Sequence, residues 1–509
     1  MHALHRRTPP GPLPAAAGPR HGLTAIGFPS GKVGPAAVPV SGRERYIRAP
    51  GSVPVADDGA ALFCPLEYRY GRTQVREIFS RTARLGRALR VEAALAATEA
   101  ELGMVPPDAA ASIAAVADTE KVPLARVDAL ERELRHDVMA IARALGEAAG
   151  PAGRWVHFGA TSADITDSAL ALELRESGEI LRADLTDLTR ALAGLARTHR
   201  ATAEVGRTHG QHGVPISFGY KMAVAAAEVM RHRRRLDQLL PRLTVGKMAG
   251  AVGTGAGFGT HAVAVEQGVM RRLGISPDEA PTQITGRDRI AEFTNWMALV
   301  AGTAERLATE VRNLQRTEIA EVAEPFDEQR QVGSSTMAQK RNPMQSENVT
   351  SLARLVRAFA LPPLENMVQW HERDLANSAN ERVVLPHSIL LVDDILTKLT
   401  EVFTGLRVDI GRMSAEVDRS AGGSMTENLM LALTGRGLAR ADAHELLRRL
   451  TKDPGAGPSL AERAKADATV RQWLEPPDID RLLDPAAYVR AAAEKTDRIL
   501  ALIDRELSA

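Results

Sequence analysis

Leucines recur every three or four residues through the stretch between about residue 165 and residue 199. They stand at Leu174, Leu181, Leu185, Leu188, Leu192 and Leu195. This spacing keeps the side chains on one narrow stripe of a helix, close to the seam of a heptad repeat. Thr161, Ser162 and Asp164 precede the stripe and are residue types that cap helix N-termini. The pattern therefore predicts one long helix that begins soon after residue 161.

Similar spacing predicts several further helices. The helical pattern begins at about residue 62, with a helix that ends at Gly103, and further helices are expected from about residue 292 to residue 321, after Asn342 and after Pro386. The helix expected at 292–321 carries an apolar face made of Trp296, Leu299, Val300, Leu307, Val311 and Leu314. Narrow stripes on several long helices have to be buried against one another, which in bundles often happens between subunits.

Strand patterns are weak, because alternating β-branched runs of the usual length are nearly absent. The glycine-rich stretch at 250–259 lacks the GxGxxG spacing and follows no strand, so it is expected to be a turn in which backbones approach closely. We therefore predict an all-α fold, with an N-terminal helical domain at 61–163, a central long-helix bundle at 164–414 and a C-terminal helical domain at 415–509. Residues 1–60 are rich in Pro, Gly and Ala, and are expected to be a disordered extension, with a targeting peptide as the alternative.

Composition and charge exclude several classes of protein. The formal net charge is +1, so the electrostatics give no support to nucleic-acid binding. Cys64 is the only cysteine, which rules out a disulfide framework within the chain and suits the reducing cytoplasm. No uninterrupted apolar run has the length needed to span a membrane, and no membrane partner is expected.

Four polar islands interrupt the helical pattern and are the candidate chemistry. They are "RHD" at 135–137, "GATSAD" at 159–164, "GRTHGQHGVP" at 206–215 and "QVGSSTMAQKRNP" at 331–343. Thr161 and Ser162 lie beside an expected helix N-terminus. Their hydroxyls either bind a carboxylate or phosphate there or only cap the helix. His209 is expected in a polar turn before a helix. It and His136 suit proton transfer, or are structural. His209 and His212 have no third ligand type nearby, so no metal is expected.

Ser334 lies in the last island and lacks the GxSxG context of a hydrolase nucleophile. As a base it needs its alkoxide stabilised, which Lys340, backbone amides and Ser335 could provide. The preceding glycine favours a loop that closes over a substrate and brings its own base.

Taken together, the islands resemble the fumarase/aspartase superfamily. "GSSTMAQKRNP" resembles that superfamily's GSSxMPxKxNP loop, and "GATSAD", "RTHGQ" and "QITGRDRIAE" occur in the family's order. The segments "YRYGRTQVREIFS", "RHDVMA", "GKMAGAVGT", "WHERDLANSANERVVLP" and "LLDPAAYVRAA" are most similar to the adenylosuccinate lyase branch. The resemblance covers about residues 62 to 505. It implies an all-helical homotetramer that splits a succinyl-containing substrate and releases fumarate, without a cofactor, in active sites shared between subunits.

The resemblance also implies roles for single residues. Ser334 would remove the Cβ proton, and His209 would protonate the leaving nitrogen with help from His136. The succinyl carboxylates would be held by Thr161, Ser162, Gln283, Ser335, Met337, Lys340 and Asn342. A nucleotide phosphate would be held by Arg69, Tyr70, Arg373, Ser378 and Arg382. Arg135, Asp137 and Thr208 belong to the matched islands and are expected at the substrate.

The loop departs from the family pattern at one place, where Ala338-Gln339 replaces the usual Pro-His. The expected substrate is adenylosuccinate, together with the related succinyl intermediate of purine biosynthesis. The alternative is a lyase of specialised metabolism, such as antibiotic biosynthesis, that releases fumarate from another amino- or nitro-substituted succinate, for example nitrosuccinate. A carboxymuconate cycloisomerase and a non-catalytic crystallin-like relative rank lower, because His209, Ser334 and Lys340 are all present.

Overall fold

The computed structural model describes residues 64–452 and 457–508 and is mainly helical, as expected. The expected extension at 1–60 lies outside the described residues. The part of the chain from residue 62 onward forms one compact unit, to which the following description applies. No helix in the described ranges combines the length and the apolar character that crossing a bilayer demands.

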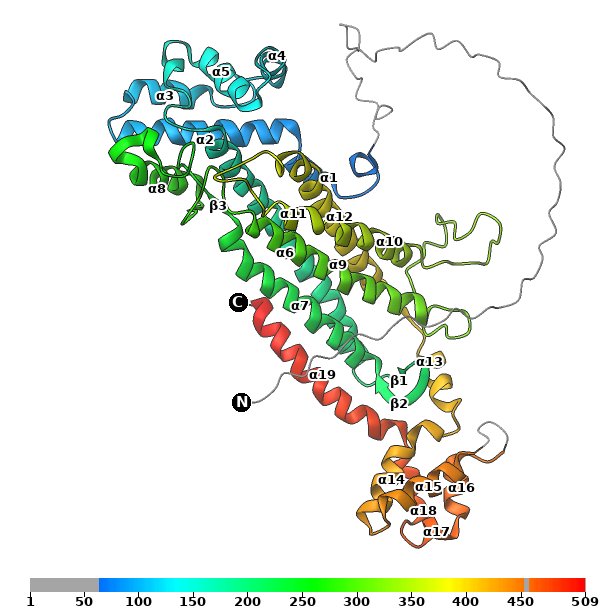
Figure 1. Cartoon of the computed structure of the whole chain (residues 1–509). Coiled ribbons are helices and arrows are strands. Elements are labelled where there is room, and N and C mark those ends of the chain that lie inside the picture. Colours follow the sequence, from blue (N-terminus) through cyan, green and yellow to red (C-terminus); the bar gives the residue numbers. More distant parts are fainter. Residues whose placement is uncertain (1–63, 453–456, 509) are drawn as a thin grey trace, which may run out of the picture. The chain divides into compact units, whose positions relative to one another are not determined.

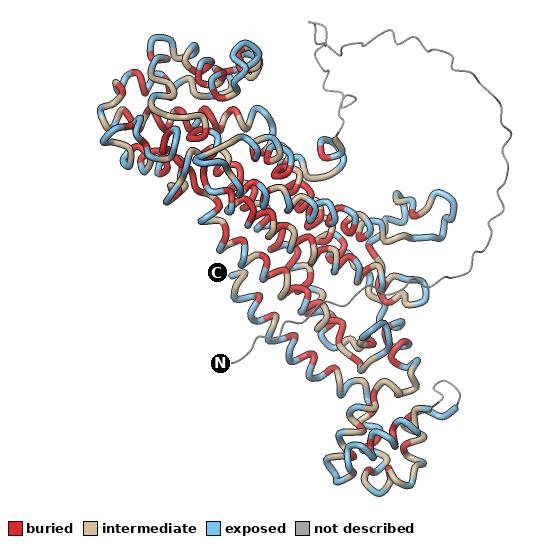
Figure 2. The backbone as a smooth tube through the Cα atoms, in the orientation of Figure 1, coloured by how far each residue is buried: buried red, intermediate tan, exposed pale blue. Residues whose placement is uncertain are grey.

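Long helices packed side by side form the centre of this unit (Figure 1). They are α6 (Ser162–Thr198), α7 (Phe218–Leu243), α9 (Asp288–Leu314), α10 (Met344–Ala358), α12 (Ser378–Thr404) and α19 (Pro485–Ser508). Their inward faces make one apolar core to which the leucine stripe of α6 contributes, and buried residues follow these faces along the helices (Figure 2). The stripe therefore does what its spacing predicts, since five of its six leucines are buried and Leu195 packs against the core.

Shorter helices form separate cores beside the bundle. Before α6 come α1 (Thr73–Ile78), α2 (Arg81–Glu101), α3 (Pro107–Val116), α4 (Leu124–Leu134) and α5 (Asp137–Ala149), and α8 (Ala262–Leu273) packs on α2. After α11 (Leu361–Glu365) and α13 (Ile410–Asp418) come α14 (Thr426–Gly435), α15 (Arg440–Leu450), α16 (Leu460–Ala466), α17 (Ala468–Arg471) and α18 (Pro476–Leu482), which share their own core. Short 3-10 helices are η1 (Pro65–Glu67), η2 (Gly150–Trp155), η3 (Ala256–His261) and η4 (Gly423–Met425).

Three small two-stranded sheets complete the described residues. An antiparallel hairpin joins β1 (Ala203–Thr208) to β2 (Gln211–Ser217). The parallel pair is β3 (Val245–Gly246) with β4 (Ser276–Pro277), and the antiparallel pair is β5 (Val322–Ala323) with β6 (Arg407–Val408). The expected polar turn at His209 is present as the turn of this hairpin, but the two strands on either side of it were not expected. The hairpin's glycines, Pro215 and polar residues hide the strand pattern, because β1 and β2 are stabilised by pairing with each other rather than by an alternating apolar face.

Two helix expectations need correction. The helix expected to follow Pro386 starts at Ser378, eight residues earlier, so that Pro386 lies inside α12. A proline removes one backbone donor but leaves the rest of a packed helix in place, so it is a weak marker of a helix start here. Leu299 is 56% exposed, although it was expected on the buried face of α9 with Trp296. The stretch at 250–259 is a turn that leads into η3, with close backbone approach as expected, since a Cβ on Gly253 would lie 2.3 Å from the Pro281 carbonyl oxygen.

Glu99 on α2 is a buried carboxyl without a compensating partner. Its side chain is fully buried, and neither carboxyl oxygen has a hydrogen-bond partner among the residues that the structure describes. Burial, helped by the nearby charge of Glu92, raises the pKa of Glu99 to about 8. Between pH 4.5 and pH 8 the unfolded chain therefore binds fewer protons here than the folded one, and this group lowers stability as the pH rises.

The change Glu99→Gln removes this titration. We compare the unfolding free energies of the variant and the unaltered chain. The difference in favour of the variant should be larger at pH 8.5 than at pH 5 by an amount on the order of 3 kcal/mol. Urea unfolding at the two pH values measures it. Glu101→Gln is the control, because Glu101 is exposed and paired with Arg272. A difference that does not change with pH would contradict the raised pKa.

Candidate active site

The start of α6 places Thr161 and Ser162 at a rigid helix N-terminus. Thr161 is the N-cap, and its backbone N–H donates to the Asp164 carboxylate over 2.8 Å. Asp164 is fully buried and forms an ion pair with the fully buried Lys247. The same carboxylate accepts backbone N–H groups from Ala249 at 2.9 Å and Gly250 at 3.1 Å. Because every contact to this carboxylate comes from a fixed element, the helix start and the 247–250 segment hold each other.

A second buried network begins one turn later on α6. The Arg287 guanidinium donates twice to Asp167, over 2.8 and 3.0 Å, and donates to Glu381 of α12 over 3.0 Å. Burial alone would raise the pKa of Asp167, but Arg287 outweighs it and the pKa is lowered. The guanidinium, whose own pKa is raised by the two carboxylates despite its burial, therefore ties the start of α12 to the start of α6.

Two sets of predicted site residues, those at 135–137 and those on α12, meet near these helix starts. His136 is the N-cap of α5, and its Nδ1 accepts the Met139 backbone N–H over 3.3 Å. Asp137 forms an ion pair with Arg382 of α12 over 2.8 Å. The turn before α5 is set by Arg135, which has a left-handed φ of 54°. Ser378 is the first residue of α12.

Gln283 and Arg373 form a neighbouring polar contact. The Arg373 guanidinium donates to the Gln283 side-chain oxygen over 3.1 Å, while the Gln283 amide nitrogen donates to the Ala251 carbonyl over 2.8 Å. Arg373 Nε is buried and has no partner among the described residues. We call these residues the helix-start group: Arg135, His136, Asp137, Thr161, Ser162, Gln283, Arg373, Ser378 and Arg382.

The β1–β2 hairpin carries Thr208 and His209 on its exposed tip. His209 and Gly210 are the two turn residues, with φ of 55° and 73°, which is the backbone that a tight two-residue hairpin requires. Below the tip, Arg207 donates to both oxygens of the fully buried Glu321 over 2.8 Å each. The imidazole of His209 is therefore presented to solvent on a firmly held support.

Ser334 lies in the exposed segment between β5 and α10. Its hydroxyl oxygen accepts backbone N–H groups from Met337 at 3.2 Å and, more weakly, Thr336 at 3.4 Å. Asn342 closes the segment by donating to the Gly333 carbonyl over 3.2 Å. Amides aimed at a hydroxyl oxygen stabilise negative charge on it, which is what a serine base needs. We call these residues the serine loop: Ser334, Ser335, Met337, Lys340 and Asn342.

Arg69 and Tyr70 lie at a fourth place, beside the middle of α12. The Lys398 ammonium stands 5.0 Å from the centre of the Tyr70 ring, and the Arg69 side chain is exposed. Asp394, which accepts the Gly71 N–H, lies 12 residues beyond Arg382 on the same helix. At the usual rise this separates the two places by roughly 18 Å.

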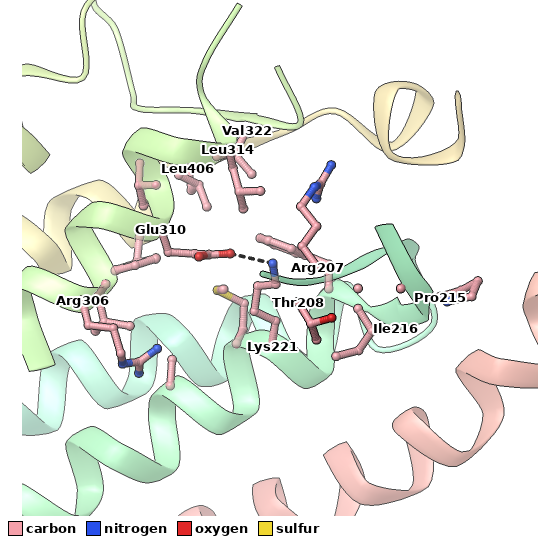
Figure 3. A pocket seen from close by; sticks show the side chains of 18 of the residues that line it. Arg207, Thr208, Pro215, Ile216, Lys221, Arg306, Glu310, Leu314, Val322 and Leu406 are labelled. Atoms are coloured by element: carbon pink, nitrogen blue, oxygen red, sulfur yellow. Dashed lines mark hydrogen bonds and ion pairs between the residues drawn. The ribbon is translucent and has the colours of Figure 1, made fainter. Parts of the chain in front are cut away.

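A cavity of about 480 Å³ lies between the hairpin, α7 and α9 (Figure 3). Its wall is mainly apolar, with the Lys221–Glu310 ion pair at 2.6 Å, Arg207 and Arg306 as charged members. Thr208 borders it, but none of the other predicted site residues does. The predicted residues are thus not gathered around this cavity.

One chain does not bring all the predicted residues together. Thr161 begins α6 and the hairpin follows its end, and a helix of 37 residues is roughly 55 Å long. The structure brings the helix-start group together, while the hairpin tip, the serine loop and Arg69–Tyr70 lie apart from it. No cluster of three or more His, Cys, Asp or Glu side chains suited to a metal occurs within the described ranges.

Several positioning residues escape prediction from the sequence, above all Lys247, Arg287 and Glu321. Lys247 and Arg287 lie inside motifs that resemble the family, "GKMAGAVGT" and "QITGRDRIAE", but their burial and their partners are set by the fold. A charged residue within an apolar or glycine-rich stretch is the one signal that could have indicated them.

Comparisons with known proteins identify the family. The chain matches the family model described as "Lyase" over residues 67–358 and the one described as "Adenylosuccinate lyase C-terminus" over residues 422–499. It is 43% identical to adenylosuccinate lyase of Pyrococcus horikoshii, over 86% of this chain and 98% of that protein. The corresponding enzyme of Methanothermobacter thermautotrophicus is 40% identical, with the same coverage of 86% and 98%. The chain therefore belongs to the lyase family of the fumarase/aspartase superfamily.

Solved structures support the same assignment. A fumarate lyase from Mesorhizobium sp. BNC1 superposes with a TM-score of 0.77 at 31% identity, covering 85% of this chain and 98% of that one. The 3-carboxy-cis,cis-muconate lactonizing enzyme from Pseudomonas putida superposes with a TM-score of 0.79 at 33% identity, covering 87% and 99%. The superfamily resemblance seen in the sequence motifs is confirmed.

The Arg287 network gives a test of the site's framework. Arg287→Met leaves the buried Asp167 and Glu381 carboxylates without their cation, so we expect a loss of about 3–5 kcal/mol in unfolding free energy. Denaturant unfolding measures it. The control is Arg200→Met, whose pair with Asp497 is exposed and should cost at most about 1 kcal/mol. Equal effects of the two changes would contradict a framework role for Arg287.

Proposed function

We propose that this chain is a lyase that breaks a C–N bond of adenylosuccinate, and of the related purine-pathway succinyl intermediate, with release of fumarate. The observation that carries the proposal is the match to proteins named adenylosuccinate lyase over 98% of their length, together with the C-terminal family model of that name. The muconate lactonizing neighbour is less similar in sequence, at 33% identity.

The serine loop supplies the base in this proposal. Ser334 removes the Cβ proton of the succinyl group, and the Met337 and Thr336 amides favour its alkoxide. The carbanion that forms spreads its charge into the adjacent carboxylate. A cation such as Lys340 and the hydroxyls and amides around it lower the energy of that charge, and stabilisation of this kind often contributes more to the rate than any other single effect.

The hairpin supplies the acid. His209 protonates the leaving nitrogen, since an imidazole gives up a proton near neutral pH. His136 assists. Its Nδ1 accepts a backbone N–H, so in the neutral ring Nε2 carries the proton and is the atom able to donate.

The remaining predicted residues bind the two ends of the substrate. Hydroxyl, amide and ammonium groups hold the succinyl carboxylates: Thr161, Ser162, Gln283, Ser335, Met337, Lys340 and Asn342. Arg69, Tyr70, Arg373, Ser378 and Arg382 hold the nucleotide phosphate, and Arg135, Asp137 and Thr208 surround the substrate. The ion pair between Asp137 and Arg382 keeps the phosphate end beside His136.

We propose further that the working enzyme is a homotetramer with shared active sites. The length of α6 keeps Thr161 and His209 of one chain roughly 55 Å apart, yet the reaction needs both at one substrate. Neighbouring copies packed with their long helices in opposite directions place the hairpin of one chain at the helix-start group of another. The exposed apolar residues Leu299 and Val224 on α9 and α7 are consistent with burial of such a bundle face.

A second substrate class is favoured by one observation. Ala338-Gln339 stands in the serine loop where the resembling loops have Pro-His, which loosens the backbone and removes a histidine. A nitro-substituted succinate such as nitrosuccinate, as used in antibiotic biosynthesis, needs no proton on its leaving group and would tolerate this change.

Fumarate release decides between the two substrates. We expect the purified protein to release fumarate rapidly from adenylosuccinate and at least about a hundredfold more slowly from nitrosuccinate, followed by absorbance. His209→Gln should lower the rate with adenylosuccinate by about 10²–10⁴-fold, the usual contribution of a general acid. Release from nitrosuccinate alone, unaffected by His209→Gln, would assign the second substrate class instead.

Mixing two inactive variants tests the shared site. Ser334→Ala and His209→Gln remove groups from the loop and the hairpin, and each should be at least about a hundredfold less active. If sites combine parts of different copies, hybrids of the two contain some intact sites, so co-expression should restore activity at least tenfold above either variant.

The matched control combines Ser334→Ala with Lys340→Met. Both changes lie in the serine loop, so no combination of these two chains contains an intact loop and activity should stay low. Hybrids of Ser334→Ala and His209→Gln, verified by native mass spectrometry, that also stay inactive would show that each chain supplies its own complete site.

A further inference from the structure

Arg72 stands three residues after Arg69 but has a different environment. Its guanidinium lies between two buried carboxylates, donating from Nε to Asp393 over 2.9 Å and from Nη2 to Asp184 over 2.6 Å. The Asp184 and Asp393 side chains are 7% and 0% exposed. A guanidinium already bound by two carboxylates is a poor ligand for a third anion, so Arg72 is not expected to contact a phosphate itself.

The backbone around Arg72 is held as firmly as its side chain. The Arg72 N–H donates to Asp393 over 3.1 Å, and the Gly71 N–H donates to Asp394 over 3.1 Å. Gly71 has a φ of 77°, and a Cβ there would lie 2.7 Å from the Leu390 side chain. Only glycine allows the turn to sit this close to α12.

The same turn fixes Tyr70 and leaves Arg69 available. Lys398 donates to Asn348 over 2.6 Å, pairs with Asp394 and stands 5.0 Å from the centre of the Tyr70 ring. The Arg69 side chain is exposed and forms no ion pair with any residue in the part of the chain that the structure describes. Arg72 is thus bound to carboxylates, whereas Arg69, three residues earlier, is open to solvent.

We propose that Arg72, clamped between Asp184 of α6 and Asp393 of α12, is a positioning residue that presents Arg69 and Tyr70 to the phosphate of the substrate. This inference rests on the proposed function and assigns to Arg72, Asp184 and Asp393 a role in nucleotide affinity without contact to the reacting atoms. The clamp joins the two helices and the turn in one rigid unit. Loss of the clamp makes the turn flexible, so Arg69 and Tyr70 are less ordered before the phosphate binds. Ordering them on binding then lowers the affinity.

The test is Asp393→Asn, which keeps the volume of the side chain and removes its charge. We expect the KM for adenylosuccinate to rise at least roughly tenfold, as for a lost charged hydrogen bond, with kcat changed by less than about threefold. Inhibition by each product shows separately how well the nucleotide end and the succinyl end of the substrate are bound. Inhibition by AMP should weaken by the same factor as KM rises, while inhibition by fumarate should stay unchanged.

The matched control is Glu173→Gln. Glu173 is also a buried carboxylate on α6, 5% exposed, and binds an arginine through two hydrogen bonds, but that arginine is Arg84 of α2. We expect its KM and its inhibition by AMP to stay within about threefold of the unaltered chain. A rise equal to that of Asp393→Asn would show general loosening of the bundle and overturn the positioning role.

Other outcomes are equally decisive. If Asp393→Asn does not fold, Asp394→Asn weakens both the anchor of the Gly71 N–H and the ion pair with Lys398 beside Tyr70, and it should raise the KM in the same direction. An unchanged KM in the folded variant, or equal weakening of AMP and fumarate inhibition, would refute the role of the clamp alone. Absence of adenylosuccinate turnover by the unaltered chain would instead refute the proposed function.

Discussion

The buried charges in the first two turns of α6 are the constraint on which the site's geometry depends. Asp164 and Asp167 are both buried, and burying a carboxylate is costly unless a cation and hydrogen-bond donors meet it. Lys247 and Arg287 supply the cations, and the backbone of residues 249–250 supplies further donors. Three segments far apart in the sequence can satisfy these charges in only one arrangement, and that arrangement sets the helix starts where Thr161, Ser162 and Arg382 lie.

The same principle recurs at two of the other places, the hairpin and the Tyr70 turn, where an arginine of the segment meets a buried carboxylate of the surrounding fold. Arg207 holds the hairpin to the buried Glu321, and Arg72 holds the Tyr70 turn to Asp184 and Asp393. In each case the residue proposed to meet the substrate lies one to three positions away from the anchored arginine. Different residues therefore anchor the segment and bind the substrate, because a guanidinium whose N–H groups already donate to carboxylates has few donors left for a ligand.

Much of the fold follows from the sequence because the central helices carry strong patterns. The leucine stripe and the capping residues place α6 nearly to the residue, and the family motifs indicate the polar islands. The hairpin could not be predicted, since Gly206, Gly213 and Pro215 obscure its strands and its stability comes from pairing. Nor could the sequence show that Lys247 meets Asp164, or which of Arg69 and Arg72 is free, since such partners are chosen by packing between distant segments.

The length of α6 has a consequence for how the protein behaves on dilution. Under the shared-site proposal, no isolated chain holds both ends of the reaction, so catalytic competence belongs to the assembly and not to the fold. Specific activity then follows the association equilibrium by mass action and falls when the protein concentration drops below the dissociation constant, even where every helix stays folded. Under the shared-site proposal, a 37-residue helix thereby makes the enzyme's specific activity depend on the protein concentration.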